Sequence, residues 1–268
     1  MADIIASKNI YDKNGVLLLA KGQKATDIVL EKLRLHEIYE KEQAATNNKI
    51  KVPAVPVTPE FKERWNLRDD RILAYANEVL STIIFESKTK PWWMLVNVLT
   101  NYVDWMYTHS LDVAMISLMI AAELKYKDNE LWNLGLGALL HDVGKIMIPK
   151  SILQKPGPLN DTEMFYMKQH CELGLSSLTA YNLSADCTDI VIQHHERLDG
   201  SGYPYGLKEN EICFNAKIVM VADTIDAITS GRPYKQPKSM DTAIKILSSE
   251  TGKYPQEIIP VLELILMS

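Results

Sequence analysis

The sequence has few cysteines and no excess of positive charge. The first absence argues against a disulfide-stabilised protein, and the second against a protein that binds nucleic acid polymers. The three cysteines, Cys171, Cys187 and Cys213, form no CxxC motif and cannot all pair, so we expect reduced, packed thiols rather than disulfides. The 268 residues hold 29 Lys and Arg against 34 Asp and Glu, a formal net charge of −5. This lacks the basic footprint of a protein that binds nucleic acid polymers, although it leaves room for a local basic pocket around a small anionic ligand.

Long hydrophobic runs are also absent. The longest nearly apolar run covers residues 113–122 and stops at Glu123, well short of the ~18 residues that a membrane span needs. The N-terminal residues MADIIASKNIYD lack the basic start and apolar stretch of a signal peptide. We therefore expect a cytoplasmic protein with no membrane span.

Residues 1–42 differ from the rest and predict a small α+β unit made of a hairpin and a helix. Asn14-Gly15 lies between two apolar segments and favours a tight hairpin turn, and Thr26 is placed to cap a short helix. Residues 43–59 are polar and then proline-spaced, which is typical of a semi-rigid linker. Such a small unit is marginally stable alone, so we expect it to pack on the main domain or on a second copy of itself.

From residue 60 to residue 268 the pattern predicts a mainly α domain. Apolar residues recur at steps of three and four, and almost no stretch alternates as a half-buried strand would. The expected helices cover residues 60–87, 92–108, 110–125, 129–144, 162–181, 185–195, 214–230, 239–250 and 255–267. Two long connections, 146–160 and 197–215, exceed the usual length of a plain loop, which indicates ordered functional segments.

Histidines and aspartates gather in this helical region. The residues in question are His109, His141, Asp142, His170, His194, His195 and Asp223. Burying so many ionisable groups without a metal would be costly, so we interpret them as one shared site. Imidazole and carboxylate ligands suit iron, manganese, zinc or nickel, and there are more of them than one ion needs. Two ions ~3.5–4 Å apart, bridged by a carboxylate and a hydroxide, can hold both oxygens of an in-line displacement at phosphorus.

Cationic side chains that suit a phosphate substrate follow the same helices. Lys145 lies three residues after Asp142, on roughly the same helix face. Arg232 and Lys235 follow the helix that carries Asp223 and Asp226. Each of these cations taken singly is more typical of a solvated surface, but together they favour a phosphate-binding site.

Four segments carry a resemblance to a known family, namely HDVGKIMIPKSIL, KQHCELG, HHERLDGSGYP and VADTIDAITSGRPYK. They resemble the HD-GYP subgroup of the HD phosphohydrolases over about residues 95–268, and HHERLDGSGYP is a very specific string. The resemblance implies an all-helical domain that hydrolyses cyclic di-GMP to pGpG, GMP or both. It also implies a cluster of two or three metal ions, commonly iron or manganese.

The resemblance further assigns roles to individual residues. One metal ion would be held by His109, His141, Asp142 and Asp223. The other would be held by Asp142, His170, His194 and His195, which makes Asp142 the bridge. Lys145 would meet the scissile phosphate and is expected, with Asp142, to be catalytic. The remaining substrate-binding positions would be Tyr203, Asp226, Arg232 and Lys235, and Gly200, Gly202 and Pro204 belong to the same loop as Tyr203.

One position departs from part of the family. Members with a third ion have a glutamate one helical turn before the first histidine, where this chain has Trp105. Asp104 is a poor substitute, because it lies about 140° around the helix from His109. We therefore predict two divalent ions, iron or manganese.

The expected function is hydrolysis of the phosphodiester bond of cyclic di-GMP by a hydroxide that bridges the two ions. Three alternatives stay open: a cyclic GMP–AMP phosphodiesterase, a cyclic di-GMP sensor with little turnover, and a general HD nucleotidase, against which the GYP loop and the RPYK segment argue. The sequence selects neither the metal, nor the base, nor the end product. It also leaves a homodimer and the input signal undecided.

Overall fold

The computed structural model describes residues 10–11, 17–19, 57–67, 70–231 and 236–267. The chain divides into two units, Met1–Pro53 and Ala54–Ser268, and each is described by itself. The boundaries expected from the sequence, with a unit at 1–42 and a linker at 43–59, stay predictions.

Two short strands are described in the first unit. Strand β1 (Ile10–Tyr11) pairs antiparallel with strand β2 (Leu17–Leu19), with Ile10 opposite Leu19 and Tyr11 opposite Leu17. The register is irregular between Ile10 and Tyr11. The expected turn at Asn14-Gly15 and the helix after Thr26 lie outside the described residues.

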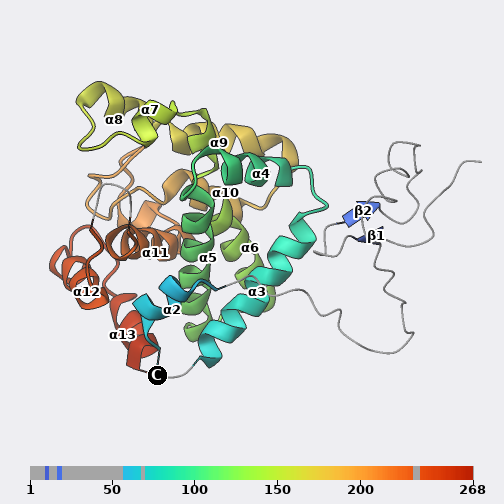
Figure 1. The fold of residues 1–268 in the computed structure, drawn as a ribbon. Coiled ribbons are helices and arrows are strands. Elements are labelled where there is room, and N and C mark those ends of the chain that lie inside the picture. Colours follow the sequence, from blue (N-terminus) through green and yellow to red (C-terminus); the bar gives the residue numbers. More distant parts are fainter. Residues whose placement is uncertain (1–9, 12–16, 20–56, 68–69, 232–235, 268) are drawn as a thin grey trace, which may run out of the picture. The chain divides into compact units, whose positions relative to one another are not determined.

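The second unit is helical in its described residues, which confirms the predicted mainly α fold (Figure 1). Its α-helices are α2 (Pro59–Trp65), α3 (Arg71–Ser87), α4 (Trp93–Tyr102), α5 (Met106–Glu123), α6 (Asp128–Leu140), α7 (Lys150–Leu153), α8 (Asp161–Lys168), α9 (His170–Leu178), α10 (Ala185–Gln193), α11 (Phe214–Thr229), α12 (Met240–Ser249) and α13 (Ile259–Met267). Three 3₁₀ turns lie between them, η1 (Val143–Met147), η2 (Thr179–Tyr181) and η3 (Glu209–Glu211).

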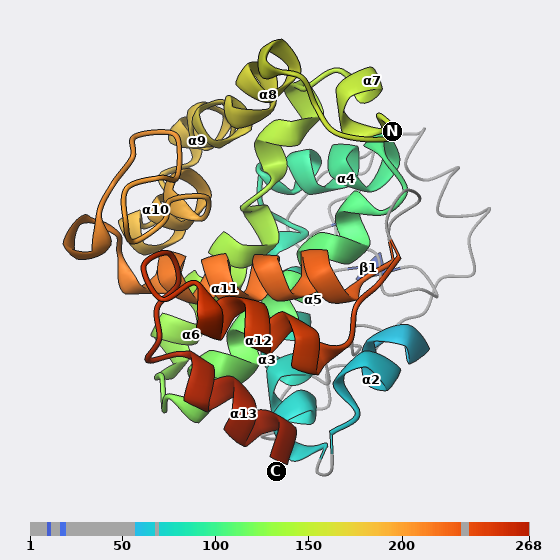
Figure 2. The same cartoon turned by 90° about the vertical axis from the view of Figure 1, so that its left-hand side faces the viewer.

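Helix α5 lies at the centre of this unit. Every residue from Val113 to Ala121 is buried, because the helix is surrounded by α3, α6 and α11 (Figure 1, Figure 2). The longest apolar run of the sequence is therefore the innermost core helix, which is the usual explanation for a run of this length. Within the described residues, no helix combines the length and the apolar character that crossing a bilayer requires.

Several expected boundaries were wrong, each for a local reason. The helix expected at 60–87 is two helices, because α2 ends where Asn66 adopts a left-handed conformation (φ 41°) and its N–H bonds the Lys62 carbonyl at 2.8 Å. The helices expected at 92–108 and 110–125 divide instead at the extended residue Val103, so that His109 lies within α5. The connection expected at 146–160 contains helix α7.

The segment 129–144 also divides, and this division shapes the site. Helix α6 ends at Leu140, and Lys145 lies on the 3₁₀ turn η1 rather than on a helix face shared with Asp142. Residues at i and i+3 are eclipsed in a 3₁₀ helix, so Lys145 still lies over Asp142. A Cβ atom at Gly144 would come 1.9 Å from the carbonyl oxygen of His170, so only glycine lets η1 approach α9 this closely.

Candidate metal centre

Five segments of the helical unit meet at one buried cluster of histidines and aspartates. His109 comes from α5, His170 from the start of α9 and Asp223 from α11. The two dipeptides of the sequence, His141-Asp142 and His194-His195, follow the ends of α6 and α10. The structure thus brings all seven predicted ligands together. Their ligand atoms form two groups, each within 4.8 Å, namely Asp142, His170, His194 and His195, and His109, His141 and Asp223.

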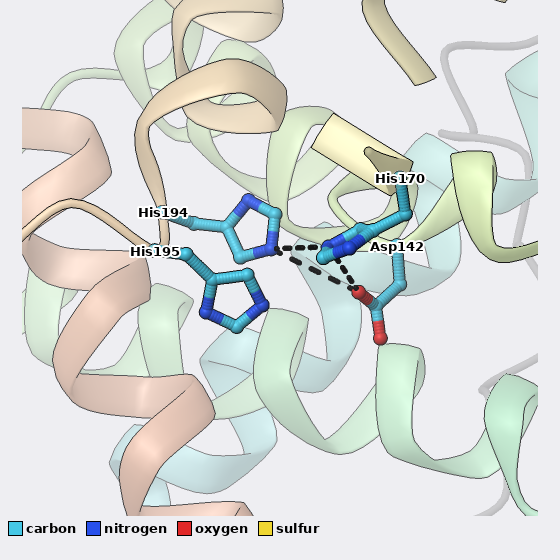
Figure 3. Close-up of side chains that lie close together, drawn as sticks. All are labelled: Asp142, His170, His194 and His195. Atoms are coloured by element: carbon cyan, nitrogen blue, oxygen red, sulfur yellow. Dashed lines mark hydrogen bonds and ion pairs between the residues drawn. The ribbon is translucent and has the colours of Figure 1, made fainter. Parts of the chain in front are cut away.

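Asp142 lies between the two groups and presents one oxygen to each. Its Oδ1 is 3.4 Å from Nε2 of His170 and 3.8 Å from Nε2 of His194 (Figure 3). Its Oδ2 is 3.4 Å from Nε2 of His141 and 3.6 Å from Nε2 of His109. A carboxylate in this position can join two cations that lie on opposite sides of it.

The buried imidazoles are oriented by hydrogen bonds at Nδ1, so that Nε2 faces the cluster. Nδ1 of His141 donates to the Ala138 carbonyl and Nδ1 of His170 donates to the Met167 carbonyl, both at 2.7 Å. Nδ1 of His194 donates to the carbonyl of Val191 at 3.0 Å. This arrangement is typical of histidines that ligate a metal through Nε2.

The ring of His109 is held between two carboxylates from one face of α11. Asp226 and Asp223 are three residues apart, so both project toward α5. Nδ1 of His109 lies 2.6 Å from Asp226 Oδ2, and its Nε2 lies 3.2 Å from Asp223 Oδ1. Burial alone would lower the pKa of His109, but the two neighbouring carboxylates, Asp223 and Asp226, raise it to about 9. The same two carboxylates would attract a metal cation.

Asp226, a predicted substrate contact, is buried and bonded to its neighbours. Its side chain is only 1% exposed, and its two oxygens are bonded to His109 and to Arg64 on α2. Asp226 thus lies behind His109, on the Nδ1 side of the ring, and its contact with substrate stays a prediction.

Three histidines of the cluster, His170, His194 and His195, are held in their neutral form. Burial, with the charge of Lys145, lowers the pKa of His170 to about 4. Burial and neighbouring histidines hold the pKa values of His194 and His195 well below their usual range. Neutral imidazole is the form that binds a metal.

Lys145 contacts the bridging carboxylate directly. Its Nζ donates to Asp142 Oδ2 at 2.6 Å, and the residue is only 8% exposed. Burial favours the neutral form of Asp142, but the charges of Lys145 and His141 outweigh it and hold the carboxyl pKa well below its usual value. Asp142 is thus a carboxylate at neutral pH.

The unsatisfied polar atoms of the cluster fit a metal site. Nε2 of His109, Nε2 of His141 and Oδ1 of Asp142 are buried and have no hydrogen-bond partner. Leaving such atoms unpaired is costly, and a bound cation would satisfy all of them. Cys171 lies beside the cluster with Sγ 3.5 Å from His170 Nε2, but burial raises the pKa of its thiol, so it stays protonated. The donors are therefore nitrogen and oxygen.

The HHERLDGSGYP loop covers one side of the cluster. The ring of Tyr203 lies 4.7 Å from that of His195, and Lys168 places its ammonium 5.3 Å from the Tyr203 ring centroid. Glu196 holds the loop, because its buried carboxylate accepts the N–H groups of Tyr205 at 2.8 Å and Leu207 at 3.0 Å. Glu196 was not predicted from the sequence, although its place directly after His194-His195 could have indicated it. Arg232 and Lys235 lie outside the described residues.

Replacing Gly202 by Ala should displace this loop. An added Cβ would lie 2.4 Å from the Glu196 Cα and 2.4 Å from the Arg197 nitrogen, and both are backbone atoms. We expect the free energy of unfolding to fall by ~1–3 kcal/mol and the KM for substrate to rise, measured by chemical denaturation and steady-state kinetics. Gly252→Ala is the control, since nothing lies within 4 Å of its added Cβ. An unchanged KM would show that the loop does not shape the substrate site.

Trp105 immediately precedes α5, and its ring lies 6.0 Å from the ring of His109 in an edge-to-face arrangement. An indole at this place offers no ligand atom comparable to a carboxylate. The expectation of two ions rather than three stays a prediction.

Comparison with known proteins gives a family match over most of the helical unit. A family model described as an HD domain matches residues 94–258. A cyclic di-GMP phosphodiesterase of Thermotoga maritima is 41% identical over 169 residues, which cover 62% of this chain and 46% of that protein. The cyclic di-GMP phosphodiesterase response regulator RpfG of Xanthomonas campestris is 35% identical over 195 residues, covering 72% of this chain and 50% of that protein.

A third relative is named for a different substrate. The 3'3'-cGAMP-specific phosphodiesterase 1 of Vibrio cholerae is 31% identical over 211 residues, covering 74% of this chain and 48% of that protein. The chain thus spans about half the length of these curated relatives. Among solved structures, the HDG"Y"P protein Bd1817 of Bdellovibrio bacteriovorus matches with a TM-score of 0.55 at 19% identity, over 98% of this chain and 95% of that chain. At this identity the likeness shows the fold alone.

Proposed function

The chain belongs to the HD domain family, and we propose that it hydrolyses a phosphodiester bond of cyclic di-GMP at a pair of divalent metal ions. The observation that carries this proposal is the position of Asp142, which presents one oxygen to each of two groups of buried ligands. An arrangement of this kind suits phosphodiester hydrolysis, because two adjacent cations can hold both oxygens of the displacement.

We assign the two ions to the two groups. His109, His141, Asp142 and Asp223 would hold one ion, and Asp142, His170, His194 and His195 would hold the other. Nitrogen and oxygen donors without thiolate suit iron(II) or manganese(II), and these are the ions that we propose. When bound, the ions would polarise the phosphoryl group and lower the pKa of a water molecule.

The side chains around the ligands would bind and orient the substrate. Lys145 is the nearest cation to the bridging carboxylate, so its ammonium would neutralise charge on the phosphoryl oxygens. Tyr203 offers an aromatic face beside His195, against which a part of the nucleotide would lie. Arg232 and Lys235 are assigned to phosphate contacts from the sequence pattern alone.

Cyclic di-GMP is the proposed substrate because it is the substrate named for the more similar of the relatives given above, at 41% and 35% identity. A cyclic GMP–AMP phosphodiesterase is the second candidate, supported by the Vibrio cholerae relative at 31% identity. The two substrates share the phosphodiester ring and differ in one base, so the metal centre does not separate them.

The test is an anaerobic assay of the purified protein loaded with Fe(II) or Mn(II), with metal content measured and products separated by chromatography. Formation of pGpG or GMP from cyclic di-GMP is the expected result. Faster turnover of 3'3'-cGAMP than of cyclic di-GMP would show that cyclic GMP–AMP is the preferred substrate. Turnover of mononucleotides alone would indicate a nucleotidase. A fully loaded protein that binds cyclic di-GMP without forming product would overturn the proposal in favour of a sensor.

A further inference from the structure

Helix α2 lies outside the residues that the family model matches, yet one of its side chains contacts a residue directly behind the cluster of ligands. This side chain is Arg64, which is half-buried at 15% exposure. One terminal nitrogen of its guanidinium, Nη1, donates to Asp226 Oδ1 at 2.7 Å and to Thr229 Oγ1 at 3.2 Å. The other, Nη2, donates to Asp112 Oδ2 on α5 at 2.5 Å. The guanidinium therefore joins three helices.

Helix α2 is firmly anchored, so Arg64 is held in place. Thr58 caps the helix by accepting the Phe61 N–H at 3.1 Å, and Pro59 occupies the first turn. Phe61 and Trp65 are each 1% exposed, and their rings stack with centroids 6.0 Å apart. The guanidinium also lies over the Phe61 ring at 5.4 Å. An arginine fixed in this way loses little further freedom when it binds a carboxylate.

The contacts of Arg64 continue directly to a proposed metal ligand. Arg64 binds one oxygen of Asp226, and the other oxygen of Asp226 binds Nδ1 of His109 at 2.6 Å. The opposite nitrogen of His109, Nε2, has no hydrogen-bond partner and faces Asp142 and Asp223. Arg64 thus fixes the carboxylate that orients the imidazole.

We propose that Arg64 is a positioning residue of the metal centre, which acts through Asp226 to hold Nε2 of His109 toward the ion. This inference rests on the proposed metal-dependent function. Carboxylates behind a ligating histidine orient the ring and increase its basicity, and their loss typically costs ~10–100-fold in metal affinity. Without Arg64, Oδ1 of the buried Asp226 would lose its charged donor, and only the contacts of Oδ2 with His109 and Ser230 would orient the carboxylate.

The test compares Mn(II) affinity of the full chain and of Arg64→Met, measured by competition with a chromophoric chelator and by the electron paramagnetic resonance of free Mn(II). We expect the Mn(II) affinity of the site that contains His109 to fall ~10-fold, and the affinity of the second site to stay unchanged. Lys62→Met on the exposed side of α2 is the matched control and should leave both affinities unchanged. Thermal unfolding of the metal-free proteins checks that the variants fold.

Two further variants separate a positioning role from a merely structural one. In an Asp226→Asn background, Arg64→Met should change the affinity by less than about twofold, because the residue through which Arg64 acts is already altered. Asp112→Asn removes the negative charge of the partner of Arg64 on α5 and leaves the contact with Asp226, so Mn(II) affinity should be retained. If Asp112→Asn weakens binding as much as Arg64→Met, Arg64 only ties α2 to α5, and the inference is wrong.

Failure of this inference can be told apart from failure of the proposed function. A wild-type chain that binds neither Mn(II) nor Fe(II) would overturn the metal-dependent function itself. A wild-type chain that binds Mn(II) with the same affinity as Arg64→Met would overturn only the role of Arg64.

Discussion

Replacing Asp142 by Asn is expected to lower kcat/KM for cyclic di-GMP by about 10³-fold or more and to release at least one metal ion. Asp142 is fully buried, and its two oxygens face the two groups of ligands. An amide of the same size keeps one carbonyl oxygen and replaces the other with an NH₂ group, which repels a cation. The substitution therefore removes the bridge without opening a cavity.

The measurement pairs metal analysis with steady-state kinetics on protein loaded with Fe(II) or Mn(II). Asp189→Asn is the control, since Asp189 is a partly buried aspartate on α10 outside both groups of ligands. Two retained ions together with near-normal turnover in Asp142→Asn would show that another group bridges the centre. Unchanged thermal unfolding of the metal-free variant would show that the loss is not one of folding.

The sequence allowed the helical fold to be predicted because most of it depends on local periodicity. The apolar steps of three and four mark the helices, and the run at 113–122 marks the innermost one, α5. The helix ends were predicted less well, since they depend on single backbone conformations such as the left-handed Asn66. The extended Val103 between α4 and α5 is a second case, since a valine within an apolar pattern does not by itself mark a break.

The site was predictable where its residues occur in pairs and not where it depends on distant contacts. The dipeptides His141-Asp142 and His194-His195 are hard to explain as separate core histidines, so they indicate a common site. Arg64 reaches Asp226 across 162 residues, and no pattern near Arg64 indicates this contact. Asp226 was assigned to substrate from the family resemblance, and its position behind His109 could not be predicted because it depends on how α5 and α11 pack.

The second large effect is expected from Lys145→Met, which should lower kcat by about 10²-fold or more while both metal ions are retained. Lys145 lies 2.6 Å from the Asp142 oxygen that faces His109 and His141, yet it is not itself a ligand. Methionine has a similar length and fills the same space without a charge, so the ligand set should keep its geometry. What is lost is the positive charge that would stabilise the phosphoryl oxygens in the transition state.

Lys150→Met is the matched control, because Lys150 is a neighbouring lysine on α7 whose ammonium lies over the Tyr102 ring at 4.8 Å rather than on Asp142. Its kcat should be unchanged. The role of Lys145 then follows from comparing the metal content of Lys145→Met with its kcat. Loss of metal in parallel with rate would mean that the ammonium mainly holds Asp142 in place, whereas loss of rate with both ions bound means that it acts on the substrate. The close contact of Lys145 with Asp142 makes either role chemically reasonable, and only the second agrees with the proposed action of Lys145 on the phosphoryl oxygens.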